Sequence, residues 1–545
     1  MQIKTCPAWR CGERTVNYRF KGPLPAPTWL DIFEAIDRKI VCPQSEMRRL
    51  PETEEKFVME ENCLIINVFV PDTDDTNLPV VAYVHGGAFQ LGFGSMAIHS
   101  PFMNTGKIIE VNFNYRLGGH GFLCLGTEDV PGNAGMKDQV AALRWVKNNI
   151  ASFGGNPGDI TLAGFSAGAV SAELLLLSKS TRGLFNKVIL ESGAGVGVWA
   201  VQTDPLQIAK TYAESQGFTN GDDIYALEKF FKNLPLDVLQ GDLFMDRRDS
   251  TFFFSPCVER IEAEDAFLTD APINIIKKGD YEKLPVLIGT TDMEGLFRLP
   301  LFEQWKDAMN KNFSDFLPND LQFENDDERQ RIAEKIKQFY FGDQAVSILG
   351  FVNYFSDVMF VYPTHRSVSL QLAAGSNSLY YYVYAFPNTN RPFNIYFGMT
   401  GAEHCDQSIT LNDIIWAPMD IPERLDTFNI KQLLVDVWQN FITSRLASGN
   451  VHVTSFGLAD IHEQRRSPSL RNPTPEGSYA AEIFGGEWRP TSLTRTQQAL
   501  FNVTSELRDA ELWPGRMAFW DEIYYKYYST PIPPPKLIEK SKIEV

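Results

Sequence analysis

An α/β fold, with a large, mostly parallel central sheet and helices on both faces, is predicted by two features of the sequence. Short apolar, β-branched segments alternate with amphipathic helical segments along the chain, and this alternation is typical of parallel sheets. A Gly-x-Ser-x-Gly motif also stands between a predicted strand and a predicted helix. There is no internal repeat and no Gly/Ser-rich linker, so a single domain is expected.

The strands are indicated by runs of Val, Ile, Leu and aromatic residues between turn residues. They are predicted at 64–71, 79–85, 107–114, 160–163, 284–290 and 379–386. A helix is predicted at 138–153, where apolar residues recur at helical spacing before a Gly-Gly pair, and others at 169–177 and 430–446. Two polar or Pro-rich segments, 451–478 and 531–535, are predicted to lack regular structure.

The charge of the chain limits its partners. Its 545 residues have a formal net charge of −18, and because an acidic surface repels phosphate polyanions, no nucleic-acid partner is expected. No stretch reaches the roughly 18 consecutive apolar residues of a membrane helix, and residues 1–10 are too polar for a signal peptide. Taken literally, the sequence predicts a soluble protein without a targeting segment.

Seven cysteines are too few for a disulfide scaffold in so long a chain, and their odd number leaves at least one thiol unpaired within it. No two form a CxxC pair, so a zinc ribbon is not expected, and we predict no metal or other cofactor. N-glycosylation sequons begin at Asn312 and Asn502. They are relevant only if the chain enters the secretory pathway.

The strongest chemical signal is the motif Gly164-Phe165-Ser166-Ala167-Gly168. A serine on a sharp strand-to-helix turn needs small neighbours, because other elements crowd the bent backbone. The turn raises the hydroxyl above the sheet edge, and the following helix N-terminus favours negative charge there. We therefore predict Ser166 as a nucleophile. The alternative is a glycine-rich turn with an incidental serine.

A second glycine motif, His85-Gly86-Gly87-Ala88, follows the strand predicted at 79–85. Ester hydrolysis develops negative charge on the carbonyl oxygen, and backbone N–H groups aimed at that oxygen stabilise it. Glycine lets the backbone approach a substrate closely. We predict Gly86, Gly87 and Ala167 as the donors of this oxyanion hole, against the alternative of an ordinary strand-end turn.

The general base can be sought by elimination among seven histidines. His404 follows the strand predicted at 379–386 and agrees with the chain order serine, acid, histidine. The other six lie before the nucleophile, in a predicted helix or in the polar loop: His85, His99, His120, His365, His452 and His462. The acid that orients the imidazole is either Glu294 or Asp292, both after the strand predicted at 284–290, and spacing does not separate them.

These motifs resemble those of the type-B carboxylesterase family of α/β hydrolases, which includes cholinesterases and insect esterases. The resemblance runs from about Tyr18 to Tyr528, and within the family the sequence looks most like insect juvenile-hormone-esterase-like enzymes. The α/β-hydrolase fold is therefore expected over 18–528, after an atypical N-terminus at 1–17 and before a Pro-rich tail at 529–545 that we expect to be disordered. The motifs in register are Glu61-Asn62-Cys63-Leu64, Asn114-Tyr115-Arg116-Leu117-Gly118, Pro131-Gly132-Asn133-Ala134-Gly135, Asp138-Gln139 and Phe153-Gly154-Gly155-Asn156-Pro157.

The resemblance implies roles for particular residues. Its Ser–Glu–His triad falls on Ser166, Glu294 and His404, which favours Glu294 over Asp292, and its oxyanion donors fall on the three residues named above. It also implies a disulfide between Cys42 and Cys63, a second serine near the triad at Ser171, an acyl pocket at Phe252, Phe253 and Phe254, and a secreted protein.

The sequence departs from the family pattern in several places. Phe165 stands where many members have Glu and hormone esterases have Gln, and Gln407 stands three residues after His404, where an acidic residue is usual. The loop between Cys42 and Cys63 contains no Trp, so choline esters are not expected as substrates. Residues 451–471 have the character of an insertion.

The leading hypothesis from sequence is hydrolysis of a small hydrophobic carboxylic ester, such as a xenobiotic, hormone or pheromone ester, through an acyl-enzyme. The alternative is a non-catalytic adhesion or binding protein on the same fold. Such relatives usually lack a triad residue and carry a membrane anchor, and this chain shows neither feature.

Overall fold

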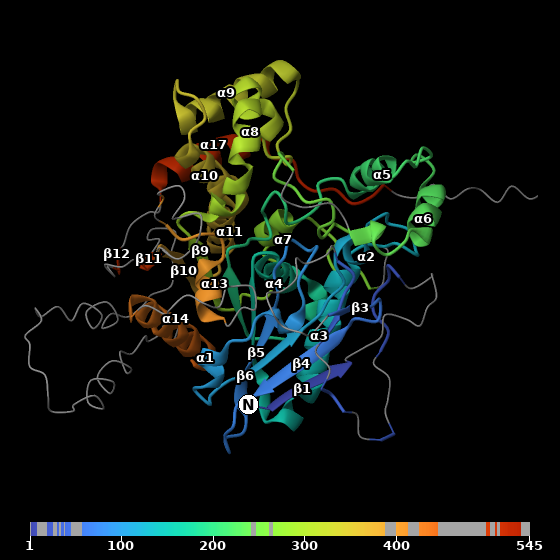
Figure 1. Ribbon diagram of the computed structural model, residues 1–545, viewed down its shortest axis with the longest axis vertical. Coiled ribbons are helices and arrows are strands. Elements are labelled where there is room, and N and C mark those ends of the chain that lie inside the picture. The colour runs from blue at the N-terminus through green and yellow to red at the C-terminus, as the bar shows by residue number, and fades with distance from the viewer. Residues whose placement is uncertain are drawn as a thin grey trace, which may run out of the picture.

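The computed structural model describes residues 19–25, 30–31, 34–36, 39–44, 57–240, 247–260, 265–386, 399, 401–412, 430–444 and 513–535, together with the backbone of 2–7, 425–429, 498–501 and 507–508. Figure 1 shows most of its strands gathered in one sheet, with a group of helices above one end. The predicted α/β-hydrolase fold is confirmed.

The central sheet has ten strands in the order β1-β4-β6-β5-β7-β8-β9-β10-β11-β12. The pairs from β6 to β11 are all parallel, whereas β1/β4, β4/β6 and β11/β12 are antiparallel. The strand bounds are β1 Gln2–Pro7, β4 Ile65–Val70, β5 Leu78–Val84, β6 Ile109–Phe113, β7 Gly155–Phe165, β8 Lys187–Glu191, β9 Val286–Thr291, β10 Leu379–Tyr384, β11 Gln498–Phe501 and β12 Leu507–Arg508. A short separate pair joins β2 Ile40–Val41 to β3 Val58–Met59.

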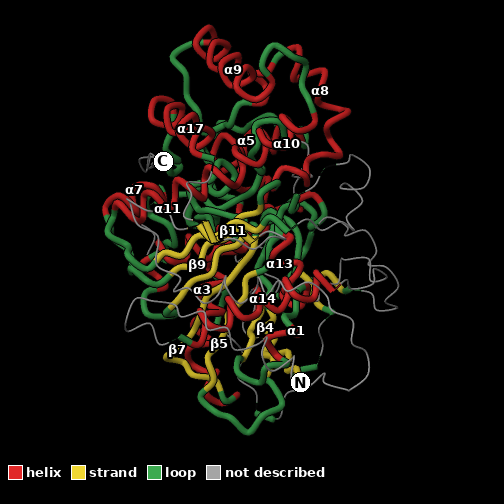
Figure 2. Tube along the Cα trace, turned by 90° about the vertical axis from the view of Figure 1, so that its left-hand side faces the viewer, coloured by secondary structure: helices red, strands yellow, loops and turns green. Residues whose placement is uncertain are grey.

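The two faces of the sheet bury different side chains. In β5, Val80, Ala82 and Val84 belong to one apolar cluster, whereas Val81 and Tyr83 belong to another, as the two-residue period of a strand requires. Both faces are buried because helices cover both. Helices α3 (Ala134–Asn149) and α4 (Ala167–Leu177) belong to the first cluster, and α1 (Ser100–Met103) and α14 (Leu425–Thr443) to the second; α14 lies over the sheet in Figure 2.

The remaining helices lie mostly above the ends of the strands in Figure 1. Helix α10 (Ile348–Ser356) passes through a π-helical turn, η8 (Asp357–Val361), into α11 (Tyr362–Ala373). Such turns often occur at functional sites. The other helices are α2 Gly118–Phe122, α5 Pro205–Ser215, α6 Ile224–Asn233, α7 Pro272–Lys278, α8 Phe302–Lys311, α9 Asp326–Phe341, α13 Asp406–Leu411 and α17 Pro514–Tyr527, with 3₁₀ turns η1 Gly94–Met96, η2 Ile150–Phe153, η3 Lys179–Thr181, η4 Val238–Gln240, η6 Glu294–Leu301 and η7 Phe313–Phe316.

Both ends of the chain have described segments that contact the rest of the protein. The backbone of Gln2–Pro7, in the atypical N-terminus, forms an antiparallel edge strand against β4. Residues 529–535, expected to be disordered, lie against the body of the protein: Ile532 N donates to the Thr203 carbonyl (3.0 Å) and Arg260 Nε donates to the Pro534 carbonyl (3.3 Å). Prolines lack an N–H, but their carbonyls still accept hydrogen bonds. The polar loop at 451–478 lies outside the described residues. No helix among those described is long and apolar enough to cross a membrane.

Candidate active site

Ser166 stands on a sharp turn between β7 and α4. Its backbone is left-handed in φ (+53°, with ψ −124°), a region that costs a non-glycine residue roughly 1–3 kcal/mol. The turn has no room for side chains beside it, because a Cβ on Gly164 would lie 2.4 Å from the Gly168 backbone and a Cβ on Gly168 would lie 2.1 Å from the Val84 carbonyl oxygen. The two glycines of the motif are therefore required by packing.

The imidazole of His404 joins the serine to a buried carboxylate. Its Nε2 lies 2.9 Å from Ser166 Oγ, and its Nδ1 lies 2.6 Å from Glu294 Oε2. Because an ionised carboxylate only accepts hydrogen bonds, Nδ1 carries the proton and donates to Glu294. The Nε2 lone pair therefore faces the serine hydroxyl, ready to accept its proton.

The structure separates the two acid candidates. Glu294 is fully buried at the end of β9, and its other oxygen, Oε1, accepts from Thr291 N (2.8 Å). Asp292 does not contact the imidazole; its Oδ1 accepts from Ala402 N (2.7 Å), and burial raises its pKa to about 6. Glu294 therefore orients the histidine ring, whereas Asp292 holds the loop that carries it.

Three of the other histidines are buried, and their contacts lie outside the Ser166–His404–Glu294 series. His85 and His120 are buried, and burial lowers the pKa of each to about 4, so both are neutral near pH 7. His99 Nδ1 bonds the Glu110 carboxylate at 3.0 Å. His365 lies in α11, as expected, and the two loop histidines lie outside the described residues.

The predicted oxyanion donors lie around the serine. Gly86 lies two residues after β5 and packs tightly against the turn at Ser166. A Cβ on Gly86 would lie 2.8 Å from the Phe165 carbonyl oxygen. Gly87 has a φ of +108°, which favours glycine, and Ala167 is the first residue of α4. Among the described residues, no hydrogen-bond acceptor is recorded for the N–H groups of these three residues, so they remain available to a substrate oxygen.

A series of aromatic ring contacts begins at the imidazole of His404. The centroid of Phe360, in the π-helical turn, lies 4.1 Å from that of His404, and Phe360 contacts Trp199, which in turn lies 5.1 Å from Phe252. Phe253 and Phe254 instead pack against Tyr212 of α5, at 5.6 and 4.9 Å. Of the three phenylalanines predicted for an acyl pocket, only Phe252 thus belongs to the aromatic series that reaches the histidine.

Comparison with known proteins identifies the family. The model of the carboxylesterase family matches residues 14–520. The chain belongs to the carboxylesterase family. It is a carboxylic ester hydrolase.

Several relatives of this carboxylesterase are known. Esterase B1 of Culex pipiens is 32% identical over 445 residues, 78% of this chain and 81% of that protein. Juvenile hormone esterase of Tribolium castaneum is 28% identical over 538 residues, 92% and 87% of the two chains. Among solved structures, the juvenile hormone esterase of Manduca sexta with OTFP covalently attached has a TM-score of 0.77 at 24% identity, covering 96% of this chain and 95% of that one. That likeness concerns the fold.

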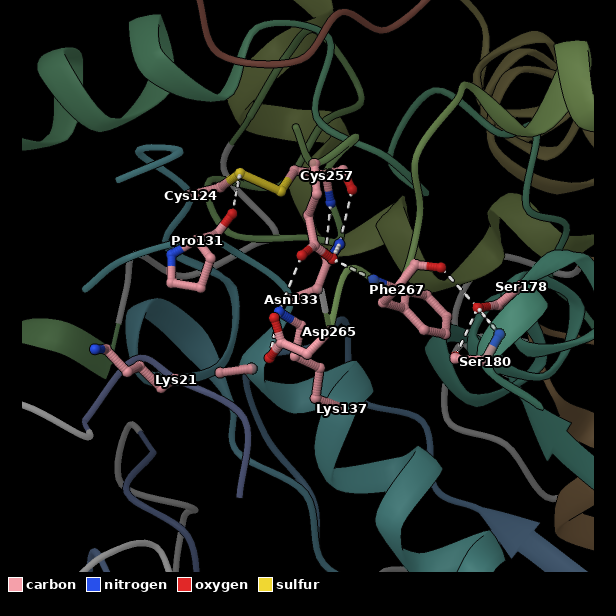
Figure 3. A network of polar contacts seen from close by, with 12 residues as sticks. Lys21, Cys124, Pro131, Asn133, Lys137, Ser178, Ser180, Cys257, Asp265 and Phe267 are labelled. Carbon is pink, nitrogen blue, oxygen red and sulfur yellow. Dashed lines mark hydrogen bonds and ion pairs between the residues drawn. A yellow bond between two sulfur atoms is a disulfide. The ribbon is translucent and has the colours of Figure 1, made fainter. Parts of the chain in front are cut away.

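The carboxylesterase has two disulfides in its described residues. Cys42 and Cys63 are bonded as the resemblance implies, and Cys124 bonds Cys257, a pair that the sequence did not indicate. Figure 3 shows this second bond beside Asn133, which bonds the Cys257 backbone in both directions, at 2.8 and 2.9 Å. Because Cys257 closely follows Phe252, the disulfide anchors the segment that carries this ring. The number of cysteines in the sequence cannot assign such a pair.

Three further residues were named from the sequence of the carboxylesterase: Ser171, Asn312 and Asn502. Ser171, the serine expected near the triad, lies on α4 with its hydroxyl 3.2 Å from Gln139 Nε2. Ser192, which the sequence did not indicate, follows Glu191, whose carbonyl accepts from Ser166 N (2.8 Å), and its hydroxyl accepts from Gln407 Nε2 (2.8 Å). The Asn312 side chain is partly exposed and bonds Asp315. Asn502 lies outside the described residues.

Proposed function

We propose that this carboxylesterase hydrolyses hydrophobic carboxylic esters through an acyl-enzyme formed on Ser166. The observation that carries the proposal is the continuous hydrogen-bonded series from Ser166 Oγ through His404 to Glu294. His404 Nε2 takes the hydroxyl proton while Oγ attacks the ester carbonyl, and Glu294 stabilises the resulting imidazolium. As the tetrahedral intermediate collapses, the imidazolium protonates the leaving alkoxide, and the acyl group remains bonded to Oγ.

Water completes the cycle by the same groups. His404 removes a proton from a water molecule, which attacks the acyl carbonyl, and the proton returns to Ser166 as the acid departs. In both steps the oxyanion is stabilised by the N–H groups of Gly86, Gly87 and Ala167. Loss of one such donor typically costs about 3 kcal/mol of transition-state stabilisation.

The acyl group is proposed to lie against the aromatic series of Phe360, Trp199 and Phe252. Phe360 lies against the imidazole, and Trp199 and Phe252 follow it in turn; apolar rings bind a hydrophobic acyl chain by removing it from water. Phe253 and Phe254 pack against Tyr212 instead.

Turnover of p-nitrophenyl acetate and butyrate tests the proposal, with Ser166→Ala as the control. We expect turnover by the native enzyme, a burst of one p-nitrophenol per active site when deacylation is slow, and loss of both in the control. Labelling by a fluorophosphonate should be confined to Ser166. Turnover that survives Ser166→Ala would refute the acyl-enzyme. Absence of any turnover in folded native protein would favour a binding protein instead.

A panel of esters graded in acyl and alcohol size tests the substrate class. Juvenile hormone belongs in the panel because relatives bear the name juvenile hormone esterase. We propose that small hydrophobic esters are substrates. Comparable rates for generic esters without hormone turnover would indicate a detoxifying carboxylesterase, whereas a strong preference for the hormone would indicate an endocrine one.

We propose that the protein is secreted, and the two disulfides support this because such bonds persist in oxidising compartments. The Cys124–Cys257 bond closes a separation of 133 residues, which in the chain-entropy account stabilises the fold by about 5 kcal/mol. The same protein expressed in a reducing cytosol and through an oxidising secretory route should differ in yield of active enzyme. Equal activity with all thiols free would argue for a cytoplasmic protein.

A further inference from the structure

The imidazole nitrogen that faces the nucleophile has a second polar neighbour. Cys405 Sγ lies 3.3 Å from His404 Nε2, the atom that Ser166 Oγ reaches at 2.9 Å. Cys405 has a left-handed backbone (φ +67°) just before α13, and its thiol is buried and unpaired. Two side chains that can each donate a hydrogen therefore compete for one lone pair.

The surroundings keep this thiol protonated. Burial, followed by the negative charges nearby, raises the pKa of Cys405 well above its ordinary value. The charged and titratable groups that face it are the His404 imidazole, the carboxyl groups of Glu294, Glu191 and Asp406, and the Tyr83 hydroxyl. The group is thus a neutral S–H donor at the pH of catalysis and not a second nucleophile.

We propose that Cys405 is a positioning residue for the general base: its S–H points at His404 Nε2 beside the Ser166 hydroxyl in the resting site and turns away when Nε2 takes the proton of Ser166. The inference rests on the acyl-enzyme mechanism proposed above. No bond to sulfur forms or breaks, because the thiol keeps its proton and only reorients. The thiol donor stabilises the neutral imidazole, so the base stays unprotonated to lower pH than it would without it.

The pH dependence of kcat/KM for p-nitrophenyl butyrate in Cys405→Ala tests this inference. We expect the midpoint of the acid limb to rise by about half a pH unit, the effect of a weak neutral hydrogen bond, with KM changed less than roughly twofold. Cys405→Ser restores a donor at the same position and should return the midpoint toward the native value. Thr410→Val is the matched control, since Thr410 lies on α13 and bonds Tyr384 and the Asp406 carbonyl without reaching the imidazole.

The outcomes are distinct. An acid limb in Cys405→Ala that coincides with the native one overturns the inference, and so does a shift that Cys405→Ser leaves uncorrected or that Thr410→Val reproduces. A fall in Tm with an unchanged limb would show that the thiol only fills space, which also overturns it. Each of these results leaves the acyl-enzyme proposal standing, whereas native activity that is independent of Ser166 would remove the basis of both.

Discussion

Replacing Glu294 by Gln changes one atom of the buried carboxylate and tests its role directly. In the native site, Oε1 accepts from Thr291 N at 2.8 Å and Oε2 accepts from His404 Nδ1 at 2.6 Å. A glutamine has only one acceptor oxygen and one NH2 group. It can serve one of these two donors but must turn its own N–H groups toward the other.

Both arrangements of the glutamine are costly. If its oxygen stays with Nδ1, the buried Thr291 N–H is left unsatisfied, at about 1–3 kcal/mol, and the bond to the imidazolium loses its charge assistance, at roughly another 1.5 kcal/mol. If the oxygen stays with Thr291, the imidazole is held in the wrong tautomer, a change that costs about 10⁴ in kcat in a serine protease triad. We therefore expect kcat to fall by roughly 10²–10⁴.

The assay is kcat for p-nitrophenyl butyrate, with circular dichroism and Tm to establish that each variant is folded. Asp292→Asn is the matched control, because the amide oxygen of Asn can still accept from Ala402 N, and its kcat should fall less than about tenfold. The reasoning would be refuted if Glu294→Gln kept kcat within tenfold of native, or if Asp292→Asn lost as much as Glu294→Gln.

Three further predictions concern pH, packing and selectivity. Burial raises the pKa of Asp320 to about 6, so its ionisation destabilises the fold as the pH rises from about 4 to 6. Asp320→Asn should therefore increase the free energy of unfolding by roughly 3 kcal/mol at pH 7.5 but by less than about 1 kcal/mol at pH 4, and Tm gains of equal size at both pH values would contradict this. Gly168→Ala places a Cβ 2.1 Å from a backbone oxygen of β5, whereas Gly515→Ala meets open space; soluble, active enzyme should be lost only in the first, as seen by yield and p-nitrophenyl acetate turnover. Phe252→Leu should change the ratio of kcat/KM for hexanoyl and acetyl esters by roughly fivefold, and a similar change in Phe253→Leu would argue against a separate role for Phe252.

The local patterns of the sequence predicted six strands of the central sheet and three of the helices that cover it, namely β4, β5, β6, β7, β9, β10, α3, α4 and α14. The strands at 64–71, 79–85 and 379–386 match β4, β5 and β10 to within two residues at each end, because alternation of buried side chains and turn residues acts over a few positions. Boundaries were less accurate where a helix extends beyond its amphipathic pattern: α3 begins at Ala134 instead of 138. Strand β8 was not predicted.

The residues of the candidate site also fall into those that the sequence predicted and those that it left open. The turn at Ser166 and the glycines around it were predicted because a sharp turn imposes its own local requirements, and elimination then indicated His404. The choice between Glu294 and Asp292 stayed open on the residues alone. The two carboxylates are two positions apart, and which of them faces the imidazole depends on the loop at Ala402, which lies 110 residues further along the chain.

The sequence by itself predicted the fold class, the sharp turn at Ser166, the glycines Gly86 and Gly87, and the histidine that the structure places against the serine. Only the tertiary structure decided which acid is bonded to that histidine, that Cys124 pairs with Cys257, that Phe252 alone reaches the aromatic series, and that Cys405 touches the imidazole. The reason is physical. A turn or a strand depends on residues a few positions apart, whereas the Ser166–His404 bond joins residues 238 positions apart and exists only once the parallel strands have brought their ends to one edge of the sheet.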